Sequence, residues 1–139
     1  MPRRMIPDKV GRVVDANYNR AKEGLRVCED IFRFVQDDRK GTSRLKGVRH
    51  RLTTAVAVFG LRDILASREI TRDVGRATIA QESCRGSVRD IFYANIQRVK
   101  ESLRVLEEFA KLKDPKASAA FKGLRYTVYE IEKNALGKM

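Results

Sequence analysis

The sequence predicts an all-α fold of four long helices, arranged as two repeated antiparallel hairpins that a long loop joins. The first observation is an internal repeat: Ala16–Glu29 (ANYNRAKEGLRVCE) returns as Ala94–Glu107 (ANIQRVKESLRVLE), with nine of fourteen positions identical. A second, weaker repeat, LKGVR at 45–49 and FKGLR at 121–125, shows that the repeated unit is a pair of segments. The second observation is the helical period of the apolar residues, and the third is that no segment alternates as a strand does.

The first repeat, expected over residues 15–66, contains two helices. Asp15 can cap a helix over residues 16–36, which the polar stretch 37–41 ends. Thr42 or Ser43 then opens a second helix that continues to the end of the repeat. Because the connection is short, these helices are expected to be antiparallel neighbours.

A stretch without helical periodicity, residues 67–86, separates the repeats. Loops of this length inside a compact domain are unusual and are often lids or binding segments. Its charged residues and glycines, among them Arg68, Asp73, Gly75 and Glu82, fit such a role. The alternative is a plain crossover between the repeats, and composition does not decide between the two.

The second repeat, expected over residues 87–137, also contains two helices. Residues 87–90 (SVRD) resemble a capping box with Asp in place of Glu, and they open a helix that runs to about Lys113. Asp114-Pro115 supplies an N-cap and a first-turn proline for the last helix. The repeats and the loop together are expected to form one helical domain over residues 1–139.

The composition is that of a folded helical chain with a strong positive charge. No run approaches the roughly 18 apolar residues of a membrane span, and the first seven residues lack the apolar segment of a signal peptide. We therefore expect a cytoplasmic protein with no membrane partner. The net charge of +12 favours nucleotides, other phosphorylated molecules or polyanions as partners. Nucleic acid is the least favoured of these, because the basic residues are interleaved with acids throughout and no RNP-like motif occurs.

Polar residues are expected in the apolar stripes at equivalent places in the two repeats. On a helical wheel of about 100° per residue, an asparagine lies at the stripe centre and an arginine about 60° away. The segment that follows each copy adds a second arginine. The same wheel places Glu29 and Glu107 on the solvated side. The six polar residues expected inside are Asn17, Arg20, Arg49, Asn95, Arg98 and Arg125.

Burying an unpaired guanidinium is costly, so each of these arginines needs a carboxylate or another anion as its partner. One interpretation is internal salt bridges, with Glu23, Glu101 and other acids as the partners. The other is a cleft between the repeats that binds phosphate, since planar arginine suits bidentate phosphate contacts. The equivalent placement in both repeats favours the second interpretation.

Several common chemistries are missing from the sequence. His50 is the single histidine, the two cysteines share no metal or redox spacing, and neither a P-loop nor a GxGxxG motif occurs. Phosphoryl transfer onto an existing phosphate remains open, because a phosphomonoester is largely deprotonated at neutral pH and needs no general base. Catalysis then requires that arginines and Mg²⁺ hold two charged phosphates in line.

Four motifs together resemble a helical family of thiamine biosynthesis. The motifs are DANYNRAKEGLRVCED (15–30), RLKGVRHRL (44–52), DVG (73–75) and ANIQRVKESLRVLEE (94–108). Members of that family occur alone or fused to the N-terminus of thiamine-phosphate synthase. The resemblance implies a hydroxymethylpyrimidine-phosphate kinase, which uses ATP and Mg²⁺ to convert the monophosphate to the diphosphate.

The resemblance and the chemistry together assign expected roles to individual residues. Arg20, Arg98 and Asp73 are expected to be catalytic, and Asp73 or Glu82 to hold Mg²⁺. Residues expected to bind the substrate or its phosphates are Asn17, Arg49, Arg68, Gly75, Asn95 and Arg125.

Two other functions stay open at this point. The chain can be a non-catalytic ligand-binding or regulatory module associated with thiamine-phosphate synthase, or a basic nucleic-acid-binding helical protein. The expected partners are a small phosphorylated pyrimidine, a nucleotide, thiamine-phosphate synthase and a second copy of the chain in a homodimer.

Overall fold

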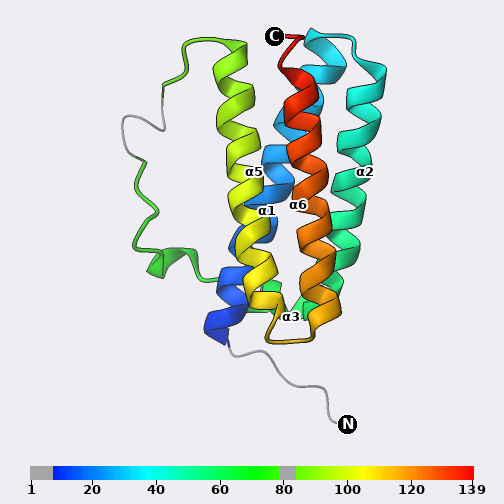
Figure 1. Ribbon diagram of the computed structural model, residues 1–139. Helices are drawn as coiled ribbons and strands as arrows, with labels where there is room; N and C mark the ends of the chain where they lie inside the picture. The colour runs from blue at the N-terminus through cyan, green and yellow to red at the C-terminus, as the bar shows by residue number, and fades with distance from the viewer. Residues whose placement is uncertain (1–7, 79–83) are drawn as a thin grey trace.

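Four long helices form the body of the protein in a computed structural model that describes residues 8–78 and 84–139. They are α1 (Asp8–Asp30), α2 (Arg39–Val56), α5 (Val88–Ala110) and α6 (Pro115–Ala135). They lie side by side as a bundle, with α1 and α5 antiparallel (Figure 1). No strand occurs in the described part of the chain, so the prediction of an all-α fold is confirmed.

The first helix begins earlier than expected and ends in an unusual turn. It starts at Asp8, so Asp15 lies inside α1 and the expectation that it caps the helix is wrong. The last turn widens to a π-helix, η1 (Ile31–Val35). This turn keeps Ile31 and Phe32 in the core, whereas Phe34 and Val35 are exposed.

The second helix begins within the stretch that was expected to separate the two. Asp38 is its N-cap, and its Oδ1 accepts a hydrogen bond from the Gly41 amide at 2.9 Å. The helix also ends before the expected boundary. It passes into η2 (Ala57–Phe59), breaks at Gly60, whose φ is +80°, and is followed by the short α3 (Leu61–Ala66).

The second repeat starts as its capping residues predict. The Ser87 side chain accepts a hydrogen bond from the Asp90 amide at 3.1 Å, and Asp114 accepts one from the Ala117 amide at 2.7 Å. Between the repeats, the described part of the connecting segment contains one short helix, η3 (Ile70–Arg72). The described parts of this segment, residues 67–78 and 84–87, lie on one side of the bundle (Figure 1).

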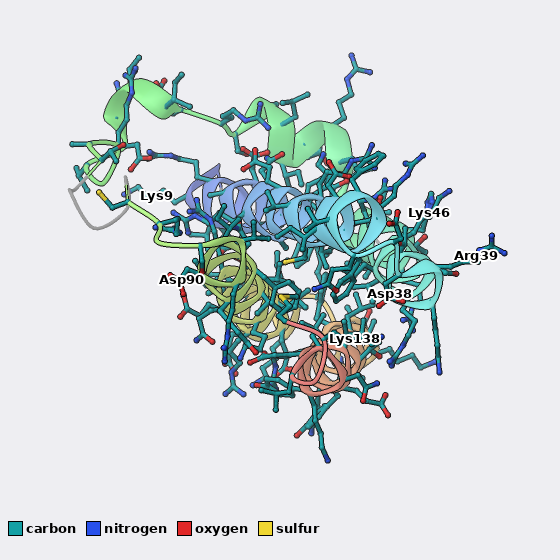
Figure 2. All side chains as sticks on the ribbon, turned by 90° about the horizontal axis from the view of Figure 1, so that it is seen from above. Lys9, Asp38, Arg39, Lys46, Asp90 and Lys138 are labelled. Atoms are coloured by element: carbon teal, nitrogen blue, oxygen red, sulfur yellow. The ribbon has the colours of Figure 1, made fainter. Side chains whose placement is uncertain are left out.

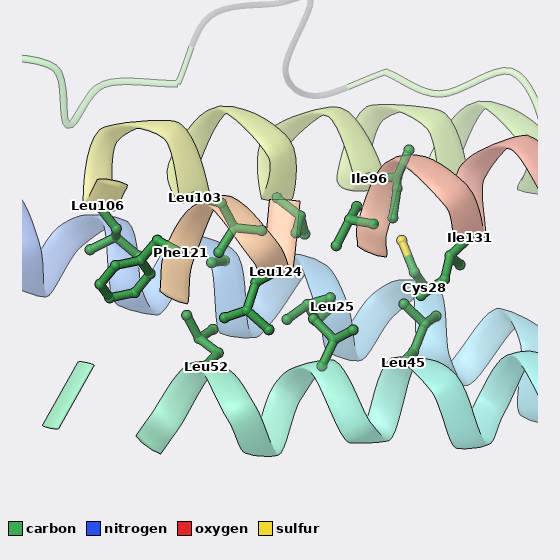
Figure 3. Close-up of a cluster of buried hydrophobic side chains, with 14 of the residues drawn as sticks. Leu25, Cys28, Leu45, Leu52, Ile96, Leu103, Leu106, Phe121, Leu124 and Ile131 are labelled. Atoms are coloured by element: carbon green, nitrogen blue, oxygen red, sulfur yellow. The ribbon is translucent and has the colours of Figure 1, made fainter. Parts of the chain in front are cut away.

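Apolar side chains from all four long helices fill the interior. Figure 3 shows Leu25, Leu52, Leu103 and Phe121 within this cluster, and each has no exposed surface. Burial also raises the pKa of the Cys28 thiol to about 12, so this cysteine stays protonated at neutral pH. The two repeats therefore meet through a packed apolar core, and the expected phosphate cleft does not lie in the interior.

The pair α1 and α5 makes the most extensive packing contact in the bundle. Gly24 lies at a point of close approach in this contact, because a Cβ there would lie 2.8 Å from Val99 Cγ2 and 3.0 Å from the Asn95 carbonyl oxygen. The equivalent residue in the second copy is Ser102, which is buried. No helix among the described residues is long and apolar enough to cross a membrane.

Candidate functional site

Each hairpin holds one arginine against a buried carboxylate. In the first, Arg49 Nε lies 3.3 Å from Glu29 Oε1, and in the second, Arg125 Nη2 lies 3.0 Å from Glu107 Oε1. Both glutamate side chains are almost fully buried, with 3% and 7% of their surface exposed. The prediction that these two glutamates face solvent is wrong, because each turns towards the next helix of its hairpin and neutralises the arginine there.

The two ion pairs differ in how far they are shielded from water. The Arg49 side chain keeps 23% of its surface exposed, whereas Arg125 keeps 10%. Arg125 also donates to the Tyr129 hydroxyl at 2.8 Å. Burial by itself lowers the pKa of Arg125, but its hydrogen bonds to Tyr129 and Glu107 outweigh burial and raise it. For Arg49 and Arg125 the geometry therefore supports the internal salt-bridge interpretation, and their partners are Glu29 and Glu107 instead of Glu23 and Glu101.

The other repeated arginines, Arg20 and Arg98, lie on the surface. Both are exposed, so the prediction that they point into the apolar stripe is wrong. Within the described residues neither makes an ion pair or a hydrogen bond, although each has a glutamate one turn ahead, Glu23 and Glu101. A long side chain at the edge of an apolar stripe buries its methylene groups and carries its charged end into water.

Arg20 and Arg98 flank the line where α1 meets α5. Arg20 is one turn before Gly24, and Arg98 is next to Val99, the residue that Gly24 touches. In this antiparallel register the two arginines are offset by about one helical turn of ~5.4 Å along the pair. Because α1 and α5 carry the two copies of the repeat and are antiparallel, we infer that their exposed equivalent residues emerge on the same side of the pair. We call this surface the outer face; it consists of Arg20, Glu23, Arg98 and Glu101.

The repeated asparagines lie between the outer face and the core. Asn17 is buried and Asn95 is half-buried. Each donates from Nδ2 to the carbonyl four residues earlier, Val13 at 2.9 Å and Ile91 at 2.8 Å. Their amides therefore satisfy carbonyl groups of their own helices, and whether they also bind substrate stays a prediction.

The connecting segment is fastened to α1 by a bidentate ion pair. Arg68 Nε and Nη2 donate to the two oxygens of Asp15 at 2.8 and 2.9 Å, and the Asp15 side chain is only 7% exposed. The hydrogen bond to Asp15 raises the pKa of Arg68. Arg12 adds a bond of 3.2 Å to the Glu69 carbonyl. Arg68 therefore makes an anchoring contact, and whether it also binds substrate stays a prediction.

The DVG motif forms a turn in the connecting segment. Asp73 Oδ1 accepts a hydrogen bond from the Gly75 amide at 2.9 Å, and both residues are exposed. Glu82, the other expected ligand of Mg²⁺, lies outside the described residues. Across residues 8–78 and 84–139 no three potential ligands from His, Cys, Asp and Glu gather around one point. Asp73 therefore offers one carboxylate to a metal, and its catalytic role stays a prediction.

Three functional or structural acids were missed or misplaced by the sequence reasoning: Asp15, Glu29 and Glu107. A signal for the last two was present, because both glutamates close the repeated fourteen-residue segment and are identical in the two copies. Each also has a repeated arginine three residues earlier, Arg26 at 3.2 Å and Arg104 at 3.4 Å. Asp15 has no equivalent acid in the second copy, where Tyr93 stands, so repetition could not reveal its partner.

Comparisons with known proteins identify the family. The model of the ThiD2 family matches residues 12–134. The chain belongs to the ThiD2 family. A relative named thiamine-phosphate synthase from Synechocystis is 44% identical over 132 residues, which are 94% of this chain and 37% of the relative.

Other relatives carry the same name and show the same partial coverage. The Nostoc sp. protein is 39% identical over 96% of this chain and 37% of its own length, and the Rhodopirellula baltica protein is 37% identical over 85% and 32%. The chain therefore spans little more than a third of the curated relatives it matches. No solved structure matches it.

Proposed function

We propose that this ThiD2 chain is a kinase that transfers a phosphoryl group from ATP to hydroxymethylpyrimidine phosphate and releases the diphosphate and ADP. Family membership and the name of the relatives support a role in thiamine biosynthesis. The observation that carries the proposal is the outer face, where Arg20 and Arg98 stand at equivalent positions, exposed and without protein partners in the described structure.

Two free guanidinium groups suit a reaction between two phosphates. One arginine would bind the terminal phosphate of the donor, and the other the phosphate of the acceptor. The acceptor oxygen is already deprotonated at neutral pH, since the second pKa of a phosphomonoester is about 6. The reaction therefore requires no histidine on the outer face.

Mg²⁺ would lower the repulsion between the two phosphates. Mg²⁺ at kinase sites is held by one or two carboxylates, the substrate phosphates and water, so a large cluster of acids is not required. Asp73 fits this need, because only one of its oxygens takes part in the turn to Gly75. Glu23 and Glu101 are further candidates, since they lie on the outer face itself.

The connecting segment would place Asp73 next to the substrates. Its start is fixed to α1 by the ion pair between Asp15 and Arg68, and α1 also carries Arg20. Glu23, one turn after Arg20, lies within electrostatic range of Arg68. The segment and the outer face are therefore linked through α1.

The experiment is incubation of the purified chain with ATP, Mg²⁺ and hydroxymethylpyrimidine phosphate, followed by ³¹P NMR. We expect signals of a pyrimidine diphosphate and ADP to grow together. ADP without the diphosphate would indicate ATP hydrolysis and would contradict the proposal.

A second candidate function is a non-catalytic module that binds the pyrimidine phosphate beside thiamine-phosphate synthase. It is supported by relatives that carry the synthase name over a length nearly three times that of the matched region. This candidate predicts that the pyrimidine phosphate binds and that no ADP forms, so the same NMR experiment separates the two.

A further inference from the structure

The solvent side of α6 carries a row of exposed residues with two aromatic rings at its centre. The row consists of Lys122, Tyr126, Tyr129 and Lys133, and we call it the α6 stripe. Tyr126 keeps 55% of its surface exposed and Tyr129 keeps 39%. Figure 2 looks along the bundle and shows side chains of α6 that project away from the other helices. Large exposed side chains that lie together, unlike scattered ones, mark interaction surfaces.

The spacing of the α6 stripe is that of a helix that packs along another helix. Its four residues are separated by steps of four, three and four residues along the chain. Alternating steps of four and three place side chains at the a and d positions of a coiled coil, which form the seam with a partner helix. The two central positions of this seam are tyrosines, and the two outer ones are lysines about 16 Å apart along the helix.

The two rings are held in place from the side of the core. Tyr126 and Tyr129 meet edge to face, with ring centres 5.6 Å apart and planes at 79°. The guanidinium of the buried Arg125 lies 5.3 Å and 5.6 Å from the two ring centres and donates to the Tyr129 hydroxyl. Because side chains that are already ordered lose little entropy on binding, this aromatic pair is a favourable centre for an interface.

The free charge of the α6 stripe is positive. Neither Lys122 nor Lys133 makes an ion pair in the part of the chain that the structure describes, and Lys122 lies 5.9 Å from the centre of the Tyr126 ring. Glu130 and Glu132, the acids beside the stripe, are paired with cations of α2 and α5 at 3.2 Å and 2.7 Å. The two lysines are therefore available to acidic groups of another molecule.

We propose that the α6 stripe is the docking surface for an amphipathic helix of an acidic partner protein. Apolar side chains of that helix pack on Tyr126 and Tyr129, and acidic side chains at its two ends pair with Lys122 and Lys133. A second copy of this chain does not fit, because pairing α6 with α6 in either direction places lysine opposite lysine. The docking surface does not depend on the kinase proposal, since the outer face is made by α1 and α5.

Single-stranded nucleic acid fits the α6 stripe less well than a helix does. Proteins that bind single strands combine stacking rings with a positively charged groove that follows the phosphates. The stripe lies on the convex surface of a helix and has lysines only at its ends. Glu130, whose side chain is 68% exposed, follows Tyr129 directly. The stripe therefore suits two separate acidic groups better than a continuous row of phosphates.

The test is fluorescence anisotropy with a labelled helical peptide that copies the spacing of the α6 stripe. Leucines occupy its two central positions and glutamates its two outer ones, and a scrambled peptide of the same composition keeps the charge but breaks the spacing. We expect the first peptide to bind at least about tenfold more tightly, because only it brings apolar and acidic groups to the stripe together. Equal affinity of the two peptides, or no binding of either, would overturn the proposal. Tighter binding of a labelled oligothymidine would assign the stripe to nucleic acid and would also overturn it.

Two variants of the α6 stripe and two matched controls locate the bound peptide. Tyr126→Ala should weaken binding about tenfold, because aromatic residues at the centre of an interface carry much of the binding energy. Leu65→Ala is its control, since Leu65 lies on α3 and has the same exposed fraction of 55%. Lys133→Gln should weaken binding about threefold, whereas Lys46→Gln, at an exposed lysine of α2, should leave it unchanged.

The controls also give the contrary outcomes. Thermal unfolding of all four variants should match that of the wild type, because the four side chains are exposed. Equal losses of binding in Tyr126→Ala and Leu65→Ala would show that the peptide binds exposed apolar surface in general. Equal losses in Lys133→Gln and Lys46→Gln would show that net charge alone attracts it. Either result would overturn the proposal.

Discussion

The two sets of repeated arginines in this protein occupy opposite environments. Arg49 and Arg125 are held inside the hairpins by Glu29 and Glu107, whereas Arg20 and Arg98 are exposed and have no such partner among the described residues. Both sets were retained in both repeats. A repeated arginine that is paired with a repeated buried carboxylate therefore stabilises the fold. A repeated arginine without such a carboxylate is available to a ligand.

The largest expected effect comes from the free arginines. Arg20→Ala and Arg98→Ala should each lower the rate of phosphoryl transfer at least about 100-fold, because arginines that stabilise transferring phosphates contribute about 10³–10⁵ in related reactions. Stability should change little. The measurement is ADP formation with the pyrimidine phosphate, together with thermal unfolding.

Arg51→Ala is the control for this experiment. Arg51 is an exposed arginine of α2, so its removal lowers the net charge equally without touching the outer face. A loss of activity as large as in Arg20→Ala would show that net charge, rather than position, matters.

For the paired arginines, Arg49 and Arg125, we expect the effect to be on stability. Glu107→Gln leaves Arg125 buried without its counter-charge and should lower the free energy of unfolding by about 3 kcal/mol. Glu29→Gln should cost less, because Arg49 is more exposed than Arg125. Urea unfolding of both variants gives the comparison, and an equal or reversed order would contradict the structural role we assign to burial.

The contact between α1 and α5 can be tested with glycines. Gly24→Ala places a methyl group 2.8 Å from Val99 and should destabilise the protein by about 1–3 kcal/mol through overpacking. Gly47→Ala, on an open side of α2, has no atom within 4 Å of the new methyl group and should stabilise by up to about 1 kcal/mol. If both substitutions changed the midpoint of thermal unfolding in the same direction, the close approach of α1 and α5 at Gly24 would be contradicted.

The smallest effect concerns the acid that caps α2. Hydrogen bonds from the Gly41 amide and from Lys138 lower the pKa of Asp38. A lowered folded-state pKa means that Asp38 stabilises the fold above the ordinary Asp value of about 3.9, and that this stability is lost as the pH falls through the lower value. Asp38→Asn should therefore reduce the loss of stability as the pH falls below the ordinary Asp value. Identical pH profiles for both proteins in urea unfolding would contradict this.

The sequence was sufficient for elements whose signals are local. Helical periodicity and the caps at Ser87 and Asp114 fix the second repeat, because a cap needs only residues within one turn. The early start of α1 was not predictable in this way. There Gly11 packs closely against Ser67, which follows α3, and Asp15 pairs with Arg68, so the first turns depend on a segment more than fifty residues away.

The candidate site was predictable in type but not in placement. The repeat identified Arg20 and Arg98 as unusual, and a helical wheel placed them within the apolar stripe. A wheel gives the angle around one helix, however, and does not show where the neighbouring helix stops covering it. The wheel placed Arg20 at the edge of the apolar stripe. In the structure α5 does not cover this edge, so the Arg20 side chain is exposed to solvent.

The most direct test of the distinction between the two sets of arginines is a binding measurement. Titration of the wild-type chain, Arg20→Ala and Arg98→Ala with hydroxymethylpyrimidine phosphate tests the outer face without requiring catalysis. We predict that each variant binds at least about tenfold more weakly than wild type while its urea midpoint is unchanged. Wild-type affinity in both variants would contradict the assignment of the free arginines to phosphate.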